Sequence, residues 1–368
     1  MQAAERAAWL RLILTPGLGP RTARKLLSVF GLPDAIFAAG LPALLRVLPE
    51  PLARELARPP GPEAQSAADA TEHWLAASTG NALLTLADRD YPQALLTTPD
   101  PPAVLFAIGR LGLLNRPAIA IVWSRNATQQ GVANAEGFAT ALARSGVTVV
   151  SGLALGIDAA AHRGALAAEG DASTIAVVGT GVDLVYPSSH RALTQDIRTR
   201  GVVISEFPLR TPAIAHNFPR RNRIIAGLAR GVLVVEAALR SGSLITARLA
   251  AEAGRDVFAI PGSIHSPLAK GCHRLIRDGA KLVESAQDVL EDLGVQAAAA
   301  RPRGDRPGTD PGSPDDALLA LIGHDPVDLD TIAKRSGRTA SELSASLLEL
   351  ELAQHVERLP GNRYQRLG

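Results

Sequence analysis

Serine, glycine and arginine residues follow several apolar runs of this sequence, and together they offer hydrogen bonds and positive charge to an anion. Ser124 and Arg125 follow the apolar run Ala118–Val122, with Trp123 between them and the run. A hydroxyl beside a guanidinium suits a phosphate, because both donate hydrogen bonds and the guanidinium keeps its charge. Ser151 and Gly152 close the next run, where glycine lets backbone amides approach a ligand. Glycine also serves turn geometry alone, so neither segment is specific by itself.

Three later segments repeat these residue types after further apolar runs. They are Arg221 and Arg223 in NFPRRNRII, then Ser241, Gly242, Ser243 and Thr246 in EAALRSGSLITA, then Lys270 and Gly271 in PLAKGC. We expect all of them on strand-end loops. Because the carboxyl ends of parallel strands meet at one rim of a sheet, the sequence predicts a groove there that binds a polyanion.

The motifs of common phosphate enzymes are absent from the sequence. It contains no G-x-x-x-x-G-K-[ST] and no G-x-G-x-x-G after its first parallel strand, which argues against a P-loop NTPase and a standard dinucleotide site. It also contains no H-E-x-x-H, no nucleophile elbow and no carboxylate cluster for a metal. We therefore expect a binding protein without cofactor, metal or catalysis.

Asp158 and His162 are four residues apart, and two interpretations fit them. On one helical turn they can form an acid/base pair. Alternatively, Asp158 caps a helix over Ala159–Ala168 and His162 makes only a local hydrogen bond. We favour the cap.

Apolar runs that alternate with amphipathic segments predict the elements that position these residues. We expect strands over Ala118–Val122, Val147–Ser151, Thr174–Gly179, Val202–Ser205, Gly231–Glu236 and Val257–Ile260, and helices over Gly131–Ser145, Ala159–Ala168, Ser189–Arg200, Leu244–Gly254 and Gly271–Asp278. This βαβ rhythm is typical of an α/β fold with a Rossmann-like, doubly wound parallel sheet.

The chain of 368 residues is long enough for two or three domains. Residues 1–70 predict a small helical domain, residues 81–294 the α/β core, the Pro- and Gly-rich residues 295–314 a flexible linker, and residues 315–368 a winged-helix domain. In the first of these, ILTPGLGPRTARKLL matches a helix-hairpin-helix turn that either contacts a nucleic-acid phosphate or simply packs on another domain.

Charge is unevenly distributed although the net charge is only +2. Residues 116–294 hold 19 basic and 15 acidic side chains, whereas residues 315–368 hold 6 basic and 9 acidic ones. The single cysteine, Cys272, excludes an internal disulfide and a cysteine-based zinc cluster. Without a basic-then-apolar leader or an apolar run of roughly 18 residues, we expect a cytoplasmic protein with no membrane association.

The order of these segments resembles the DNA-processing protein A family, also called DprA or Smf. The matching stretches cover most of residues 90–285 and include YPQALLTTPDPPAVLFAIG, VVSGLALGIDAAAHRGAL, NFPRRNRIIAGL, VVEAALRSGSLITARLAAEAGRDVFAIPG and KGCHRLIRDGAKLV. The resemblance implies an extended Rossmann-like core with a small helical domain of SAM or helix-hairpin-helix type before it. It also implies a homodimer that binds and protects single-stranded DNA and helps to load the RecA recombinase in natural transformation.

Carried over by position, the resemblance implies a set of DNA-binding residues. Ser124 and Arg125 match its G-S-R loop, Arg221 and Arg223 its R-N-R segment, Ser241–Thr246 its S-G-S-x-x-T segment, and Lys270 with Gly271 its K-G pair. Trp123 departs from this pattern, since the family has glycine there. The indole either stacks on an unpaired base, worth about 1–3 kcal/mol in single-strand binders, or obstructs the pocket. We favour partial obstruction.

The predicted winged helix is unsuited to duplex DNA. Its third helix, Thr339–Leu352, contains three glutamates and no lysine or arginine, whereas a recognition helix needs cations. We expect this domain to contact protein.

Two rival functions remain open from the sequence. The first is a nucleotide-binding Rossmann-like enzyme such as a nucleoside-monophosphate N-glycosidase. That group is marked by P-G-G-x-G-T with a nearby glutamate. The corresponding loops here, EAALRSGSLIT and AIPGSIHSP, lack this motif, although Glu236 can stand in for the glutamate. The second is a scaffold whose groove is closed by Trp123.

Overall fold

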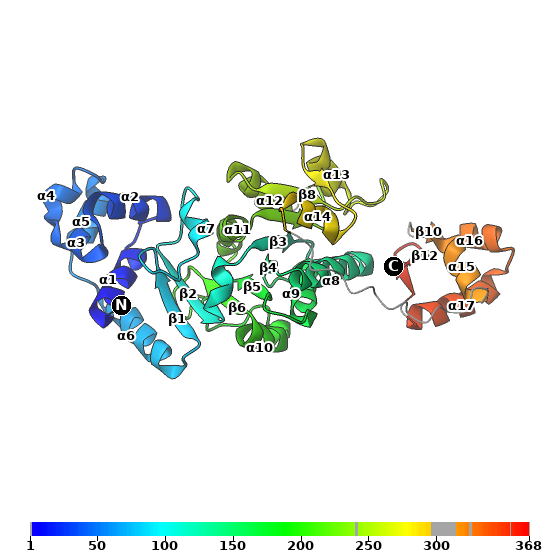
Figure 1. Cartoon of the computed structure of the whole chain (residues 1–368), viewed down its shortest axis with the longest axis horizontal. Coiled ribbons are helices and arrows are strands. Elements are labelled where there is room, and N and C mark those ends of the chain that lie inside the picture. Colours follow the sequence, from blue (N-terminus) through cyan, green and yellow to red (C-terminus); the bar gives the residue numbers. More distant parts are fainter. Residues whose placement is uncertain (1, 240–241, 296–313, 324–325, 354, 368) are drawn as a thin grey trace.

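Short runs of aliphatic residues form a nine-stranded sheet with the order β1-β2-β6-β5-β4-β3-β7-β8-β9. The computed structural model describes residues 2–239, 242–295, 314–323, 326–353 and 355–367 (Figure 1). The strands are β1 (Asn81–Thr85), β2 (Val104–Gly109), β3 (Ala118–Val122), β4 (Thr148–Ser151), β5 (Thr174–Val177), β6 (Val202–Ser205), β7 (Gly231–Val234), β8 (Asp256–Ala259) and β9 (Lys281–Leu282). The predicted α/β fold is thereby confirmed.

The strands from β6 to β9 in this order run parallel, and β1 and β2 extend the sheet as an antiparallel edge. From β3 the chain adds β4, β5 and β6 on one side, and later β7, β8 and β9 on the other. The loops after β3 and β7 therefore diverge. Ligands of doubly wound sheets bind at this kind of switch point, beyond the carboxyl ends of the strands.

Helices cover both faces of the sheet (Figure 1). One face carries α7 (Gln93–Leu96), η1 (Leu111–Asn115), α11 (Asn217–Leu228), α12 (Ser243–Glu252) and α13 (Lys270–Arg277). The other carries α8 (Gln129–Arg144), α9 (Ile157–Ala167), η2 (Ser188–His190), α10 (Arg191–Arg200) and α14 (Ala286–Asp292). Strands that are covered on both faces are mostly apolar, and β3 (AIAIV) and β7 (GVLV) are so throughout.

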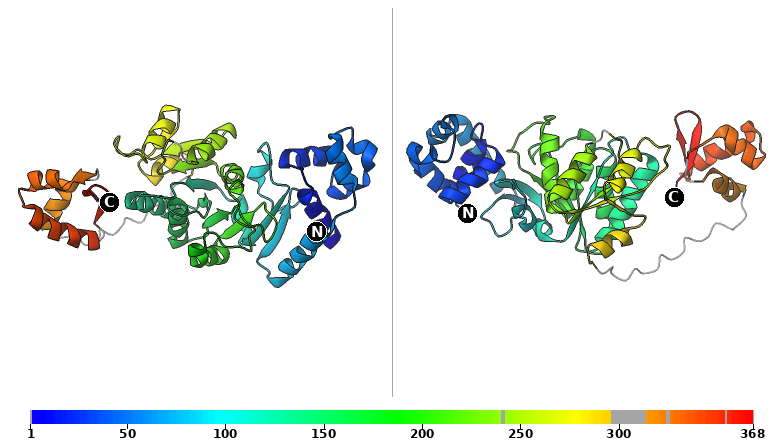
Figure 2. Two further views of the ribbon diagram at one scale, coloured as in Figure 1. Left: turned by 180° about the vertical axis from the view of Figure 1, so that it is seen from behind. Right: turned by 90° about the horizontal axis from the view of Figure 1, so that it is seen from above.

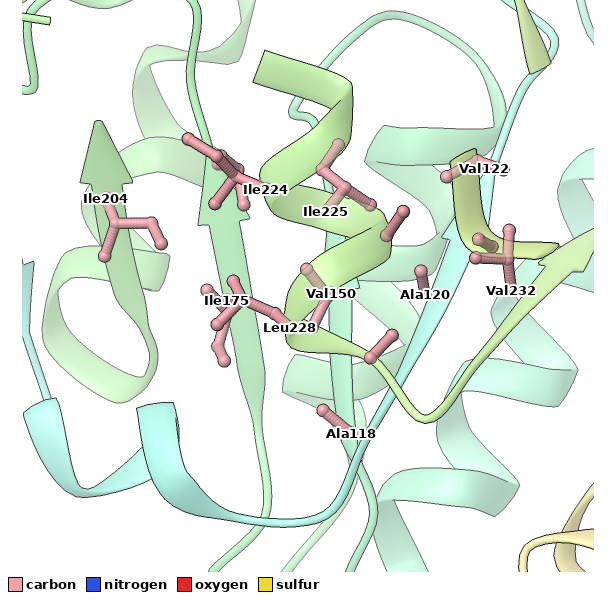
Figure 3. Packing of buried hydrophobic residues seen from close by; sticks show 14 of the residues in the cluster. Ala118, Ala120, Val122, Val150, Ile175, Ile204, Ile224, Ile225, Leu228 and Val232 are labelled. Atoms are coloured by element: carbon pink, nitrogen blue, oxygen red, sulfur yellow. The ribbon is translucent and has the colours of Figure 1, made fainter. Parts of the chain in front are cut away.

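Helix α11 lies where the sequence analysis expected a strand-end loop, so that expectation was wrong. Pro219 lies in its first turn, where the missing N–H costs nothing. Ile224, Ile225 and Leu228 then pack on Ile175 and Val150 of the sheet (Figure 3). This packing fixes the rotation of α11 and hence the direction of each of its arginines.

The N-terminal helices pack on the β1–β2 edge and share one hydrophobic core with that end of the sheet (Figure 2). They are α1 (Ala3–Leu14), α2 (Pro20–Phe30), α3 (Pro33–Ala38), α4 (Gly40–Leu44), α5 (Glu50–Ala57) and α6 (Pro62–Ala77). Two cations of the predicted hairpin have internal partners: Arg24 donates to the carbonyl of Thr98 at 2.6 Å, and Lys25 to that of Val47 at 3.0 Å. These contacts favour the packing interpretation of the hairpin over the phosphate one.

The C-terminal unit combines three helices with a three-stranded sheet of order β10-β12-β11. Its elements are α15 (Pro314–Ile322), β10 (Val327–Asp328), α16 (Leu329–Ser336), α17 (Ala340–Leu352), β11 (Val356–Leu359) and β12 (Arg363–Arg366). The predicted linker falls almost wholly on residues 296–313, outside the described ranges. Over the ranges described, no helix is both long and apolar enough to cross a bilayer.

Candidate nucleic-acid interface

A pocket of about 100 Å³ opens beyond the carboxyl ends of β3, β4 and β5. Three of the predicted site residues, Arg125, Gly152 and Arg221, line it together. They come from the loop after β3, the loop after β4 and helix α11. The remaining wall is formed by Leu153, Ala154, Leu155, Val178, Gly179, Thr180, Tyr186, Pro187 and Phe218.

Arg221 is a buried cation in the wall of this pocket. Its side chain is 1% exposed, its Nη1 donates to the carbonyl of Val177 at 2.6 Å, and its Nε has no partner among the described residues. Burial lowers the pKa of Arg221 to about 10, although the charge of Asp158 opposes this shift. The guanidinium is thus still charged at neutral pH, and a buried charge without a hydrogen-bonded anion is costly. An anion in the pocket would relieve that cost.

Gly152 makes room for this guanidinium. A Cβ at Gly152 would collide with Nη1, Cζ and Nη2 of Arg221, so any other residue would displace them. The backbone N–H of Gly152 donates to Asp158 at 3.1 Å, so it is already used inside the protein. The sequence analysis expected this amide to approach a ligand; the structure instead gives the glycine a steric role.

Arg125 lies over two aromatic rings at the mouth of the pocket. Its Cζ is 5.3 Å from the ring centroid of Trp123 and 5.8 Å from that of Phe218, and its side chain is exposed. The Phe218 ring is in turn 5.5 Å from the ring of Tyr186, which is 50% exposed. Cations beside exposed rings are what unpaired nucleotides require, because the phosphates bind the cations while the bases stack on the rings.

Asp158 and His162 hold the wall formed by residues 152–155. The Asp158 carboxylate accepts hydrogen bonds from the N–H groups of Gly152, Ala154 and Trp123. The cap interpretation was wrong in detail, because α9 begins at Ile157 with Gly156 as its N-cap, and Asp158 binds the loops beside it. His162 accepts from the Leu153 N–H at 3.2 Å and does not pair with Asp158.

His162 is a neutral, wholly buried imidazole. The Thr174 hydroxyl donates its proton to the Val149 carbonyl at 2.8 Å. His162 Nδ1 lies 2.7 Å from Thr174 Oγ1 and is therefore the donor in the hydrogen bond between His162 and Thr174. Nε2 then carries the lone pair that faces the Leu153 N–H. Burial, with smaller repulsion from Arg221, lowers the pKa of His162 to about 3.

Arg223 points away from the pocket, although it is only two residues from Arg221. It pairs with the buried carboxylate of Glu206, donates to the carbonyl of Asp100 at 2.7 Å, and lies 3.6 Å from that residue's carboxylate. Residues two apart on a helix lie about 200° around its axis. Arg223 therefore secures α11 to its neighbours, which corrects the prediction that it lies with the other cations.

Several other predicted site residues are buried. Ser151 is 0% exposed and donates to the Ile121 carbonyl at 2.7 Å. Gly271 packs on Ala237, where a Cβ would lie 2.5 Å from the carbonyl oxygen. Thr246 is 0% exposed, and its Oγ1 has no partner within the described residues. Ser151 and Gly271 thus support the strand-end loops from within.

The remaining predicted residues do not line this pocket, or lie outside the described residues. Ser124 is half-buried, and its hydroxyl accepts from the Asn126 N–H at 3.2 Å. Gly242 and Ser243 begin α12, and Lys270 is exposed at the start of α13. Ser241 lies outside the described residues.

The amino end of α8, the usual phosphate site of doubly wound folds, is occupied by carboxylates. Glu236 accepts hydrogen bonds from the N–H and hydroxyl of Thr128, and a Cβ at Gly131 would collide with it. Glu357 of the winged helix accepts from the Gln129 N–H at 3.2 Å. Burial raises the pKa of Glu236. The N–H groups of Thr128 and Gln129 therefore have acceptors within the protein.

Phe218, Tyr186 and the segment 178–180 are pocket residues that the sequence analysis missed. The sequence contained a signal for residues 178–180, because the segment V-G-T-G lies at the carboxyl end of the predicted strand Thr174–Gly179. Phe218 and Tyr186 had no such signal. Their rings meet only because the loop after β5 folds over the start of α11.

Comparison with known proteins identifies similar sequences and structures. Residues 82–294 match the family model DNA recombination-mediator protein A, and residues 301–362 match the DprA winged helix domain. Protein Smf of Escherichia coli (strain K12) is 44% identical over 283 residues, which are 75% of each chain. DNA processing protein DprA of Streptococcus pneumoniae is 49% identical over 209 residues, or 57% of this chain and 73% of that protein.

Two solved structures are also similar. The X-ray structure of DprA from Streptococcus pneumoniae matches with a TM-score of 0.62 and 36% identity, over 79% of this chain and 98% of that one. DNA processing protein A from Helicobacter pylori, described for its single-stranded DNA binding mode, matches with a TM-score of 0.52 and 30% identity, over 57% of this chain and 95% of that one.

Proposed function

This chain belongs to the DNA recombination-mediator protein A family, and we propose that it binds single-stranded DNA in the pocket of Arg125 and Arg221 without catalysing a reaction on it. The observation that carries the proposal is the buried, incompletely paired guanidinium of Arg221 in a pocket that the half-buried ring of Phe218 and the exposed ring of Tyr186 also line. The similar protein from Helicobacter pylori is described as binding single-stranded DNA, which supports the same ligand here.

Unpaired DNA fits the pocket better than the alternatives do. A pocket of about 100 Å³ admits a phosphate or part of one nucleotide, and it offers no surface for the groove of a duplex. A mononucleotide held as in related enzymes would need the amino end of α8, which Glu236 fills. An unpaired strand can instead bind Arg125 and Arg221 through its phosphates and stack its bases on Phe218 and Tyr186.

Salt dependence tests the proposal. We expect the affinity for a short unpaired oligonucleotide to fall steeply with salt, with a slope of about −0.7 per contacted phosphate. Arg125→Ala should weaken binding roughly tenfold and reduce this slope by about 0.7, since one phosphate contact is lost. Fluorescence anisotropy measures both. Arg144→Ala is the matched control, because Arg144 is exposed at the opposite end of α8. Equal salt slopes for wild type and Arg125→Ala would count against the site.

We propose that the C-terminal domain contacts protein and adds little to DNA affinity. Helix α17 carries Glu342, Glu349 and Glu351, and it exposes Leu348 (56%) and Leu352 (77%). In the same titration, a chain ending at residue 295 should therefore bind within a few-fold of the full chain. A hundredfold loss would refute this assignment.

We further propose that the protein works as a cytoplasmic homodimer that helps to load the RecA recombinase onto strands in recombination and natural transformation. Leu282 supports the dimer, because this apolar side chain is 50% exposed on the edge strand β9, where a second copy can cover it. Light scattering should give twice the chain mass of 38.4 kDa, and Leu282→Arg should return it to 38.4 kDa. A single-chain mass for wild type at micromolar concentration would contradict the dimer.

A further inference from the structure

Four arginines lie on the rim of the sheet opposite the pocket, where the parallel strands begin. Arg116, Arg200 and Arg230 precede β3, β6 and β7 by one or two residues. Arg110 follows β2, which is antiparallel to β6 and so ends at the same rim. In the order β2-β6-β5-β4-β3-β7 these strands span about 24 Å at the usual spacing between strands. We call these four residues the amino-rim arginines.

Printed contacts join three of the amino-rim arginines around the loop before β5. Arg110 donates to the carbonyls of Arg200 at 3.2 Å and of Asp171 at 3.3 Å. Arg116 lies 3.6 Å from the carboxylate of Asp171. Arg200 donates to the Leu166 carbonyl at 2.8 Å. Because a guanidinium has five N–H donors, these contacts orient the side chains and leave further donors for a ligand.

The positive charge of this rim is incompletely balanced. Apart from Arg116, the amino-rim arginines are exposed, and within the described ranges these three have no carboxylate partner. The loop before β5 supplies two acidic residues, Glu169 and Asp171, of which Asp171 is 84% exposed. An ion pair so exposed to water contributes little, so a stronger anion can replace it. Asp256, at the start of β8, already pairs with Lys281 at 3.6 Å.

This rim has no apolar anchor for a protein partner. Over the part of the chain that the structure describes, exposed large apolar side chains lie in the terminal domains, in loops at the carboxyl ends of the strands, in α12 and in β9. None lies at the amino ends of β3 to β7. Protein interfaces are centred on apolar and aromatic anchors, whereas cations alone can bind a sugar-phosphate chain. The rim therefore suits the backbone of a nucleic acid.

We infer that the amino-rim arginines form a second binding surface, which holds phosphates of a long unpaired strand on the rim opposite the pocket of Arg125 and Arg221. This inference rests on the proposed function, because both surfaces take the same ligand. A strand of about four nucleotides, the lower end of single-strand site sizes, fills the pocket but is too short to pass around the sheet. Only a longer strand reaches both surfaces.

Removing two of these charges should weaken the binding of long strands alone. In the double variant Arg110→Gln/Arg200→Gln, both side chains keep N–H donors but lose their charge. We expect it to bind an oligo-dT of about 40 nucleotides ten- to thirtyfold more weakly than wild type at 0.1 M salt, with a salt slope smaller by about 1.4, or about 0.7 per lost contact. An oligo-dT of about four nucleotides should bind both proteins equally. Fluorescence anisotropy measures each titration.

The double variant Arg54→Gln/Arg58→Gln is the matched control. It also removes two exposed arginines, but these pair with Glu50 and Glu55 at helix α5. It should bind the long strand as wild type does. If the control loses as much affinity as the amino-rim variant, net charge alone is responsible and the inference is wrong.

Arg230→Gln tests the surface without disturbing an internal contact, because the Arg230 side chain makes no hydrogen bond or ion pair with the described residues. It should bind the long strand about fivefold more weakly, with a slope smaller by about 0.7. Thermal unfolding of each variant checks that the fold is kept, and this single variant decides the question if the double variant is unstable.

The outcomes separate this inference from the proposed function. If the amino-rim variants bind the long strand with wild-type affinity and slope, the inference is wrong, and an acidic protein becomes the candidate partner of this rim. If they lose affinity for both strands equally, they act through the fold and the inference is again wrong. If they lose it for the long strand alone while Arg125→Ala leaves the short strand unaffected, the inference holds and the proposed pocket is wrong.

Discussion

A Gly152→Ala variant is expected to bind a short unpaired oligonucleotide ten- to a hundredfold more weakly than wild type. The new Cβ takes the place of the Arg221 guanidinium, whose three terminal atoms are its nearest neighbours. Arg221 keeps its charge but leaves its position, and a hydrogen bond to a charged group contributes about 1.5–3 kcal/mol. Anisotropy titration at fixed salt measures the loss.

Gly137→Ala is the control for this variant. Gly137 is a glycine of helix α8 in the same domain, and a Cβ there meets no atom within 4 Å. It should bind like wild type. Overpacking of a core typically costs about 1–3 kcal/mol, so Gly152→Ala should remain folded with a lowered midpoint of urea unfolding. If Gly152→Ala keeps wild-type affinity, Arg221 is not the anion ligand.

Acidification from pH 7 to pH 5 is expected to destabilise the protein through His162 by about 2 kcal/mol. Its pKa is about 3 in the folded protein and near 6.5 when exposed. As pH falls below about 6.5, the unfolded state gains a proton that the folded state does not take up. The stability that His162 contributes is therefore complete above about pH 6.5 and is lost progressively toward pH 3.

Urea unfolding of wild type and variants at pH 7 and pH 5 measures how much of the loss of stability is due to His162. His162→Gln removes the titrating group, so its stability should change by about 2 kcal/mol less than that of wild type between the two pH values. His216→Gln, at an exposed position of the same domain, should keep the wild-type difference. A comparison of variants is needed because other buried groups also titrate. Burial raises the pKa of Glu206 and Glu236, so these two carboxyl groups stabilise the folded state as the pH falls, opposite to the effect of His162. An identical pH response in His162→Gln and wild type would exclude His162 as the source.

Protonation of His162 should also change the wall of the pocket. Protonated Nε2 would face the Leu153 N–H, so two donors would oppose each other where one hydrogen bond now holds the wall. The neutral imidazole thus links the stability of β4 and β5 to the shape of the site.

The sequence by itself predicted the six parallel strands β3 to β8 and the approximate position of the site, but not β1, β2 and β9. Runs such as Ala118–Val122 and Val202–Ser205 can be buried on both faces only as strands between helices, and segments that follow such strands gather at one rim. Arg125 and Gly152 lie in such segments, whereas Arg221, which was predicted on the same argument, lies on helix α11. This argument needs only the local apolar pattern and the rule that the carboxyl ends of parallel strands meet at one rim of the sheet.

Only the tertiary structure decided what each of these residues does. Arg221 and Arg223 have the same chemistry two positions apart, yet the packing of Ile224, Ile225 and Leu228 turns one toward the pocket and the other toward Glu206. Likewise, Gly152 is needed for a guanidinium that is remote in sequence. The direction of a side chain is set by contacts between segments far apart in the chain, and local sequence does not encode those contacts.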